Sequence, residues 1–561
     1  MENKNLTGYP SIDKPWLKYY DEKAINGTLP KKTMYQYAFE KNKDNLSEIA
    51  LVYFGKRITY SKLFENVYYT AKAFVSMGIE EGDIVTIMSM HTPETIYTIY
   101  ALNYIGATAN LVYMTLSENE LIQSIENTKS KMLLVLDAVL EKITNSKIEI
   151  PVIVLPISNS MPFARKAGYL LTTKRVNHNY IMYDSFVKKG LSADIKKAIN
   201  NSELTAVIVY TSGTTGESKG VCLSSYNINT AAYQYIISGK NYKRNETFLD
   251  IVPTFLAFGV IMMHLSICAG ITNYICIYPE AEKSISEFFK IRPNRFVIGP
   301  AYIEPLISKI DSNIDFLVDL SGGGGGISEK KERELNYILK KYNSKSKYTI
   351  AYAMTECSAA ACSSNNTIYK FQSAGIPLPQ TTIKIIDSNS YNELTYNTEG
   401  EICICAPSVM KGYYNNLNSS KDVLFNDDGH TWLRTGDLGY IDNDGFLFIT
   451  GRIKRIYITK ASDNVIYKLF PQRIEELLES TEHVIHCGVI VKNDSDRINV
   501  PIAFVECNAQ ISLNELWTIS KVDLPEHMQP VDIIKLDKMP LTLSGKIDYR
   551  SLEKMAEEQH T

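Results

Sequence analysis

Hydrophobic and polar positions along this chain follow two alternating patterns. Short, mostly apolar runs, among them Ile84–Met88 and Lys131–Leu136, predict buried strands. Between such runs lie longer segments with signals for the start of a helix, namely Thr92 before Pro93 and the capping box Ser117–Glu120. Repeated strand–helix units predict largely parallel sheets whose faces are covered by helices. The pattern therefore indicates an α/β protein.

One stretch is long and apolar enough to be weighed as a membrane span. From Ile251 to Pro279 the chain has no Asp, Glu, Lys or Arg, and about 20 apolar residues suffice to cross a bilayer. Pro253 and Gly259 interrupt the stretch, however, and Gly270 divides it into a helix-like half and a strand-like half. We therefore expect a buried helix followed by a central strand, and no transmembrane span.

The C-terminal part of the chain predicts a second, smaller unit. Its expected elements are a helix, two strands and a final helix, near 473–480, 484–492, 500–506 and 549–558. A chain of 561 residues exceeds what one hydrophobic core organises, so at least two domains are expected. We place the large domain at 1–453 and the small α+β domain at 454–561.

Composition and charge narrow the class of protein. Hydrophobic residues make up 45% and charged residues 22%, which is typical of a globular protein. The net charge of −3 gives no reason to expect nucleic acid or an anionic membrane as a partner. Nine cysteines occur without Cys-x-x-Cys pairs, and the chain starts with no apolar signal segment. We expect a cytoplasmic protein with reduced thiols.

The segment Tyr210–Gly220 has the composition of a polyphosphate-binding loop. Three glycines, three threonines and two serines surround Lys219, directly after a short apolar run. Glycines let the backbone approach an anion closely, and the hydroxyls and the lysine add donors and positive charge. The loop is not a Walker A motif, because Ser218 precedes the lysine and Gly220 follows it. A surface turn is the alternative interpretation.

This segment resembles the signature of the adenylate-forming superfamily, which includes acyl-CoA synthetases, luciferases and peptide-synthetase adenylation domains. That signature reads Tyr/Phe-Thr-Ser-Gly-Thr-Thr-Gly-x-Pro-Lys-Gly, and this chain departs from it only at Ser218, which stands in the proline place. The resemblance implies a large domain of βα-layered sheets with a distorted barrel, followed by a small mobile domain whose hinge lies near Lys454. It also implies ATP, Mg²⁺ and coenzyme A as cofactors.

Further motifs extend the resemblance and imply roles for their residues. In Ala351–Glu356, Tyr352 would stack on adenine, Thr355 would bind phosphate and Glu356 would hold Mg²⁺. Lys546, in a Gly-Lys-Ile motif of the small domain, would act in catalysis together with Glu356 and Thr355. The residues expected to bind the nucleotide are Thr211, Ser212, Gly213, Thr214, Thr215, Gly216, Lys219, Gly324, Tyr352, Asp437 and Arg452.

The resemblance also points to an acid-binding pocket. The segment Val252–Gly259 corresponds to a family segment with a histidine gate, and Leu256 occupies the histidine place. The residues expected to line the pocket are Phe255, Leu256, Phe258, Gly259 and Gly323. Because this segment carries no charge, we expect an apolar acid, fatty or aryl, rather than an amino acid. Core packing is the alternative for each phenylalanine taken singly.

The implied reaction has two steps, and three functions remain open. A carboxylate would attack the α-phosphorus of ATP to give an acyl-adenylate and pyrophosphate, and coenzyme A would then take the acyl group. The first candidate function is an acid–CoA ligase. The second is an adenylating enzyme that loads a carrier-protein thiol or an amine, and the third is a nucleotide-binding protein without catalysis. The acid and the oligomeric state stay undetermined.

The segment Ile458–Phe470 is the largest departure from the family. It is longer than its family counterpart and has no glycine, although Asn464 can adopt a left-handed conformation. Lys460 and Lys468 are candidates to meet the phosphates of coenzyme A, and a merely longer surface loop is the alternative. We expect thioester transfer to be slower than adenylation.

Overall fold

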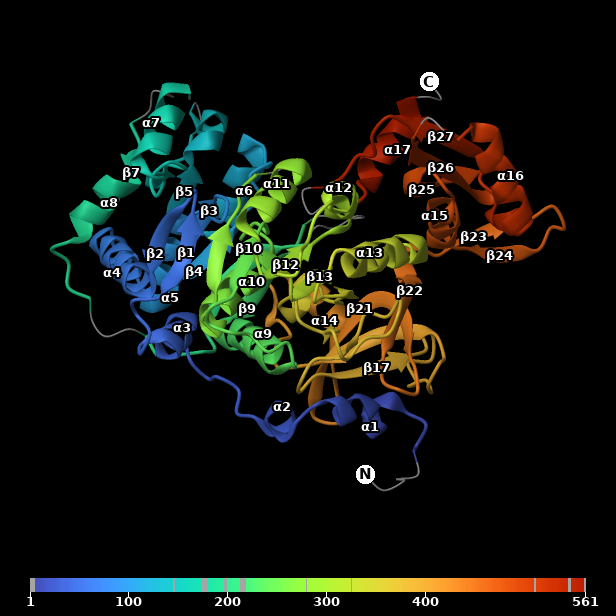
Figure 1. Ribbon diagram of the computed structural model, residues 1–561, viewed down its shortest axis with the longest axis horizontal. Coiled ribbons are helices and arrows are strands. Elements are labelled where there is room, and N and C mark those ends of the chain that lie inside the picture. The colour runs from blue at the N-terminus through green and yellow to red at the C-terminus, as the bar shows by residue number, and fades with distance from the viewer. Residues whose placement is uncertain are drawn as a thin grey trace.

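The computed structural model describes residues 6–144, 147–172, 179–195, 199–211, 218–278, 280–323, 325–508, 511–542 and 546–558. Two large sheets flanked by helices, a smaller antiparallel sheet and a C-terminal unit make up the molecule (Figure 1). This arrangement confirms the predicted α/β class. Within the described ranges, no helix is long and apolar enough to cross a bilayer.

The first large sheet has eight strands in the order β19-β9-β8-β4-β3-β5-β6-β7. Its strands are β3 (Ile84–Met88), β4 (Thr108–Leu111), β5 (Met132–Leu136), β6 (Val152–Leu155), β7 (Ile181–Met182), β8 (Thr205–Tyr210), β9 (Gly220–Ser224) and β19 (Gly412–Tyr413). The six strands from β8 to β7 in this order pair in parallel, as predicted. Helix α5 (Pro93–Ile105) starts at the predicted cap Thr92 and ends at Gly106, where φ is +79°.

The second large sheet has seven strands in the order β14-β13-β12-β10-β11-β1-β2. Its strands are β1 (Ile49–Tyr53), β2 (Lys56–Thr59), β10 (Thr247–Asp250), β11 (Thr272–Ile275), β12 (Arg295–Ile298), β13 (Asp319–Gly322) and β14 (Tyr348–Ile350). All neighbours except β1 and β2 run parallel. The carboxyl ends of these strands therefore meet at one edge of the sheet, where the loops that follow them are brought together.

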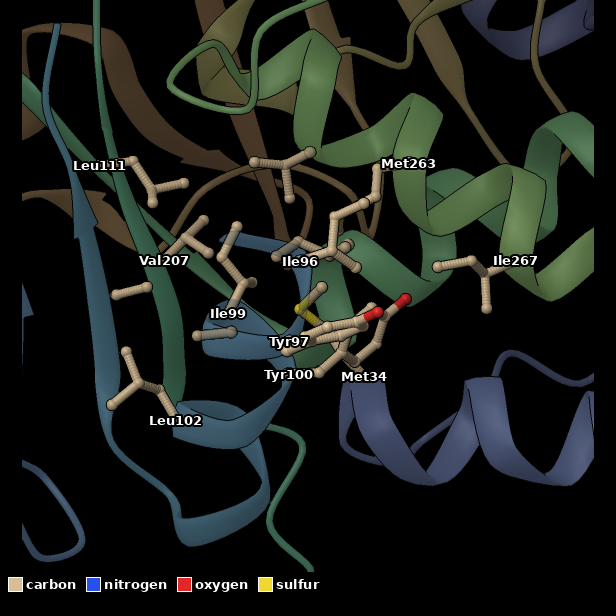
Figure 2. Packing of buried hydrophobic residues seen from close by; sticks show 14 of the residues in the cluster. Met34, Ile96, Tyr97, Ile99, Tyr100, Leu102, Leu111, Val207, Met263 and Ile267 are labelled. Atoms are coloured by element: carbon tan, nitrogen blue, oxygen red, sulfur yellow. The ribbon is translucent and has the colours of Figure 1, made fainter. Parts of the chain in front are cut away.

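The uncharged stretch folds as the sequence predicts. Helix α10 (Ala257–Ala269) is followed by Gly270 in the left-handed region, with φ +72°, and then by β11 inside the sheet. Figure 2 shows Met263 and Ile267 of this helix packed among Met34, Tyr100 and other buried side chains. His264, also in α10, bonds Tyr100 at 2.7 Å, and burial lowers its pKa to about 3. The helix is thus part of a protein core.

A smaller antiparallel sheet follows. Its strands are β17 (Thr382–Ile386), β18 (Gly400–Cys405), β20 (Leu424–Asp427), β21 (His430–Ile441) and β22 (Leu447–Arg452). The turn between β21 and β22 contains Asp444 and Gly445, and Gly445 has φ +94°. The register of this hairpin sets Asp437 opposite Arg452. Two charged residues 15 positions apart in the sequence are therefore neighbours by strand pairing alone.

The C-terminal unit has buried clusters of its own. Its elements are β23 (Tyr457–Lys460), β24 (Ile466–Leu469), α15 (Pro471–Ser480), β25 (Val484–Asp494), β26 (Ile498–Cys507), α16 (Leu513–Asp523), β27 (Asp532–Leu536) and α17 (Tyr549–Glu558). Two clusters of buried apolar residues draw all their members from 469–556. Figure 1 shows the unit beside α13 (Glu329–Lys341) and β22. The division of the chain into two domains between residues 453 and 454 stays a prediction.

We expect Phe504→Ala to lower the unfolding free energy of the C-terminal unit by ~3–5 kcal/mol, because it leaves a cavity at a fully buried position. The matched control is Phe288→Ala, which removes an equally buried ring from the core beside β12. Calorimetry should show two transitions, with each variant shifting a different one. A single transition that both variants shift alike would contradict the two-domain division.

Candidate functional site

A cavity of about 1510 Å³ collects side chains from distant parts of the chain. It lies at the carboxyl edge of the second large sheet and is bordered by α10, by the β21–β22 hairpin and by the C-terminal unit. The predicted site residues that line it are Thr211, Lys219, Phe255, Leu256, Phe258, Gly323, Thr355, Glu356, Asp437, Arg452, Lys454 and Lys546. The fold therefore brings together most of the residues that the motifs single out.

The remaining predicted residues fall into two groups. Ser212, Gly213, Thr214, Thr215, Gly216 and Gly324 fall outside the described residues. Tyr352 does not border the cavity, since its side chain is buried in the cluster around Trp16 and Ile383. Gly259 lies in the first turn of α10, where it faces the backbone of Pro253 rather than the cavity.

The two ends of the predicted phosphate loop are tied to each other. The Thr211 amide donates to the Lys219 carbonyl at 3.1 Å, and the Lys219 amide donates to the Thr211 hydroxyl at 3.3 Å. The Lys219 ammonium lies 4.9 Å from the centre of the Tyr413 ring. The lysine and the threonine thus border the cavity from the points where the loop leaves β8 and enters β9.

Glu356 is a nearly buried carboxylate at the cavity wall. The Tyr413 hydroxyl donates to its Oε1 at 2.8 Å. Burial raises the pKa of Glu356, and the Tyr413 hydrogen bond acts in the opposite direction. The described residues contain no group of three or more His, Cys, Asp or Glu that suits a metal. A single carboxylate fits Mg²⁺ when phosphate oxygens and waters supply the other ligands, which is the usual arrangement for this ion.

Asp437 is held by two partners. The Tyr352 hydroxyl donates to its Oδ2 at 2.7 Å, and Arg452 Nε lies 2.8 Å from its Oδ1. The Asp437 carboxylate is buried, whereas the Arg452 side chain keeps about half of its surface exposed, at 53%. Each carboxylate oxygen still has a lone pair for a further donor such as a sugar hydroxyl. The arrangement therefore leaves Asp437 able to bind a ribose.

Lys546 enters the cavity from the C-terminal unit. Burial, and next the positive charge of Arg452, lower the pKa of Lys546, while Asp437 and Glu356 oppose that shift. Its neighbours in the cavity are therefore the residues that the sequence assigns to nucleotide and metal binding. Lys546 thus adds a basic side chain to the part of the cavity that Glu356, Asp437 and Arg452 border.

Comparison with known proteins identifies the family. Residues 39–414 match the family model described as AMP-binding enzyme, which spans more than half of the chain. This chain belongs to the AMP-binding enzyme family. The probable 4-coumarate–CoA ligase 1 of Dictyostelium discoideum is 27% identical to it over 562 residues, covering 95% of this chain and 97% of that protein. The 2-succinylbenzoate–CoA ligase of Oceanobacillus iheyensis is 26% identical, covering 89% and 95%.

Solved structures show the same fold. ATP-bound MatB from Rhodopseudomonas palustris has a TM-score of 0.78 at 20% identity, covering 94% of this chain and 100% of that one. The o-succinylbenzoate coenzyme A synthetase from Bacillus subtilis, solved with ATP and magnesium ion, has a TM-score of 0.75 at 23% identity, covering 92% and 99%. ATP, Mg²⁺ and coenzyme A, the predicted cofactors, are thus those found with CoA-ligating members of the family.

Sequence reasoning missed several residues of the site in this family member. Tyr413 is one of them: its hydroxyl bonds Glu356, and its ring lies beneath the Lys219 ammonium. Lys240 and Asp319 also line the cavity, and no motif marks them as site residues. A charged residue at the start of a buried strand, such as Asp319, is the one available signal, because burial of a charge requires a partner.

We expect Gly259→Ala to impair use of the acid substrate roughly 10-fold or more, because small displacements at a binding wall are costly. A Cβ there would lie 2.0 Å from the Pro253 carbonyl oxygen, so the segment that carries Phe255 and Leu256 would have to move. The measurement is kcat/KM for the acid in ATP–pyrophosphate exchange.

The matched control is Gly168→Ala in helix α7 (Phe163–Thr172), where an added Cβ meets nothing within 4 Å. It should leave kcat/KM for the acid within ~2-fold, as for most surface substitutions. Equal values for Gly259→Ala and wild type would show that the close approach of Gly259 to Pro253 does not support the acid-binding wall.

Proposed function

We propose that the protein is an AMP-forming acid–CoA ligase, which activates a carboxylic acid with ATP and transfers the acyl group to coenzyme A. The observation that carries the proposal is the meeting of Lys546, from the C-terminal unit, with Glu356, Asp437 and Arg452 in one cavity. Family membership supports the adenylation step, and the printed names of the relatives support the ligation step for those proteins.

In the first step, a carboxylate oxygen of the acid bonds to the α-phosphorus of ATP, and the bond from that phosphorus to pyrophosphate breaks. Lys546 would offset the negative charge that builds up between the acid and the α-phosphate. Lys219 would bind the departing phosphates, and Asp437 would orient the ribose. Glu356 would hold Mg²⁺, which neutralises phosphate charge when bound. These residues position groups and offset charge rather than react covalently.

In the second step, the thiol of coenzyme A attacks the acyl carbon, and AMP leaves with the electrons of the broken carbon–oxygen bond. A carrier-protein thiol or an amine is the alternative acceptor. The segment 458–470 folds as the β23–β24 hairpin with Asn464 at φ +65°, the left-handed conformation that the sequence allows. Lys460 and Lys468 do not line the cavity. Their contact with coenzyme A and a slow second step stay predictions, as does a small-domain rotation at Lys454.

The acid is proposed to have an apolar body, fatty or aryl. Support comes from the side chains of Phe255, Leu256, Phe258 and Met262, which form one wall of the cavity. An ammonium or a second carboxylate against this wall would lack a partner. We also retain a cytoplasmic location and the absence of nucleic-acid partners as predictions.

The deciding experiment is ATP–pyrophosphate exchange with a panel of fatty, aryl and amino acids, followed by detection of acyl-CoA. Exchange with an apolar acid and formation of its CoA thioester would support the proposal. Exchange without thioester would favour another acceptor. Nucleotide binding with no exchange for any acid would favour the third function, a non-catalytic nucleotide-binding protein.

We expect Lys546→Ala to slow adenylation by ~3–4 kcal/mol of barrier, by analogy with the loss of one oxyanion donor. Thioester formation from a supplied acyl-adenylate should be spared, because the lysine is assigned to the first step only. Single-turnover assays of the two half-reactions measure this. Lys554→Ala, at an exposed position of α17, is the control and should change neither step. An equal loss in both half-reactions would contradict the assignment.

The pH profile tests the charge of Lys546 separately. Because its pKa lies below the usual lysine value, the side chain loses its positive charge at lower pH than an ordinary lysine, and kcat/KM for ATP should fall as pH rises through that pKa. Lys546→Arg should be slower but should lack this alkaline limb, since a guanidinium stays charged. An unchanged limb in the arginine variant would assign it to another group.

A further inference from the structure

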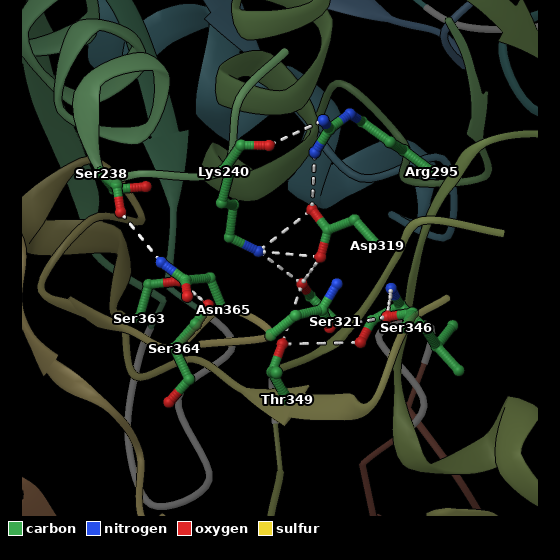
Figure 3. Close-up of polar contacts among 12 residues, drawn as sticks. Ser238, Lys240, Arg295, Asp319, Ser321, Ser346, Thr349, Ser363, Ser364 and Asn365 are labelled. Carbon is green, nitrogen blue, oxygen red and sulfur yellow. Dashed lines mark hydrogen bonds and ion pairs between the residues drawn. The ribbon is translucent and has the colours of Figure 1, made fainter. Parts of the chain in front are cut away.

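The cavity has a second polar region, away from the predicted nucleotide residues. Figure 3 shows it at the amino ends of β12 and β13, where Lys240 reaches Asp319 and Ser321. Lys240, Tyr242, Asp319 and Ser321 line the cavity there, and we call these four residues the polar end. The acid–CoA ligase mechanism uses none of them.

The geometry of β13 sets the distance between the polar end and Gly323, which lies beyond the other end of the strand. Side chains alternate along a strand, so Asp319, Ser321 and the following Gly323 share the face that borders the cavity, while Leu320 points into the opposite core. From Asp319 to Gly323 the strand rises four residues, or roughly 13 Å. Ser321 and Gly323 are small and leave space along this face. An acid whose carboxylate lies near Gly323 would extend toward the polar end.

The charges of the polar end are balanced within the protein. Lys240 Nζ lies 3.0 Å and 3.1 Å from the two oxygens of Asp319, and 2.7 Å from the Ser321 hydroxyl. Arg295 bonds Asp319 at 3.1 Å and Glu246 at 2.6 Å. Two cations therefore face two anions. A distal carboxylate or ammonium on the acid would find no uncompensated charge here, whereas a neutral polar group would find donors and acceptors.

Tyr242 adds a hydroxyl that the protein does not use. Its ring is stacked under Arg295, whose guanidinium carbon lies 4.0 Å from the ring centre. Tyr242 borders the cavity, and within the part of the chain that the structure describes its hydroxyl feels the charges of Arg295 and Asp319 without a hydrogen-bond partner. Burial raises the pKa of Tyr242, so the hydroxyl stays a donor at neutral pH. By contrast, the nearby Tyr235 hydroxyl donates to the Ala359 carbonyl at 2.9 Å.

We propose that the polar end recognises a neutral hydrogen-bonding group, a hydroxyl or a carbonyl, at the distal end of an acid whose body is apolar. Tyr242 bonds this group directly, and the Lys240–Asp319–Ser321 network holds the surrounding polar surface in place. The inference rests on the proposed acid–CoA ligase function and narrows its substrate class. It makes Tyr242 a residue that determines specificity, with no part in the chemistry at the phosphate.

The test compares matched acids in ATP–pyrophosphate exchange, with 3-phenylpropanoic acid and its 4-hydroxy analogue as probes. Wild type should use the hydroxylated acid with kcat/KM higher by ~10-fold or more, because a site built to bond a hydroxyl disfavours an analogue that lacks it. Tyr242→Phe, which removes only one oxygen, should reduce this ratio by ~10-fold through loss of one hydrogen bond. It should leave the unsubstituted acid within ~2-fold, because that acid makes no such bond.

Tyr337→Phe serves as the control, because Tyr337 is an exposed tyrosine of α13 that does not line the cavity. It should keep the wild-type ratio. Equal use of the two acids by wild type, or an equal loss for both acids in Tyr242→Phe, would overturn the inference while leaving the ligase function standing. An absence of exchange with every acid of the panel would instead overturn the proposed function and this inference together.

Discussion

The ion pair between Asp437 and Arg452 is the interaction on which the arrangement of the site depends. Strand pairing sets the two residues opposite each other in the β21–β22 hairpin, and Tyr352 fixes the second oxygen of the carboxylate. Arg452 also lowers the pKa of Lys546, which reaches the same cavity from the C-terminal unit. The β21–β22 hairpin of the small sheet thus contacts Tyr352, which follows β14 of the second large sheet, and lies near Lys546 of the C-terminal unit.

The cavity has two chemically different regions. At the carboxyl edge of the second large sheet, Glu356, Lys219 and Lys546 present the charges that a nucleotide with a metal requires. At the amino ends of β12 and β13, Lys240 and Asp319 neutralise each other and leave polar atoms without net charge. Small residues on one face of β13 separate the regions. A cavity built this way suits a molecule with a reactive charged end, an apolar body and a neutral polar tip.

Much of the fold follows from local sequence because its causes are local. Thr92 and Pro93 begin a helix and Gly106 ends it, since caps satisfy backbone groups within one turn. Gly270 ends α10 before β11 because glycine tolerates the positive φ that this position requires. The predicted phosphate loop and the Thr-Glu and Gly-Lys motifs are contiguous, so the sequence alone predicts the family and its cofactors.

The tertiary structure decides which side chains meet. The sequence places Tyr352 and Gly259 in the site, yet one ring packs in the core around Trp16 and the glycine faces the Pro253 backbone. Conversely, Lys240, Arg295 and Asp319 lie on three separate segments and become partners only when β12 and β13 pair in their observed register. Local sequence determined where helices, strands and the phosphate loop begin and end. The contents of the cavity were decided by strand order and register, because these depend on contacts between residues far apart in the chain.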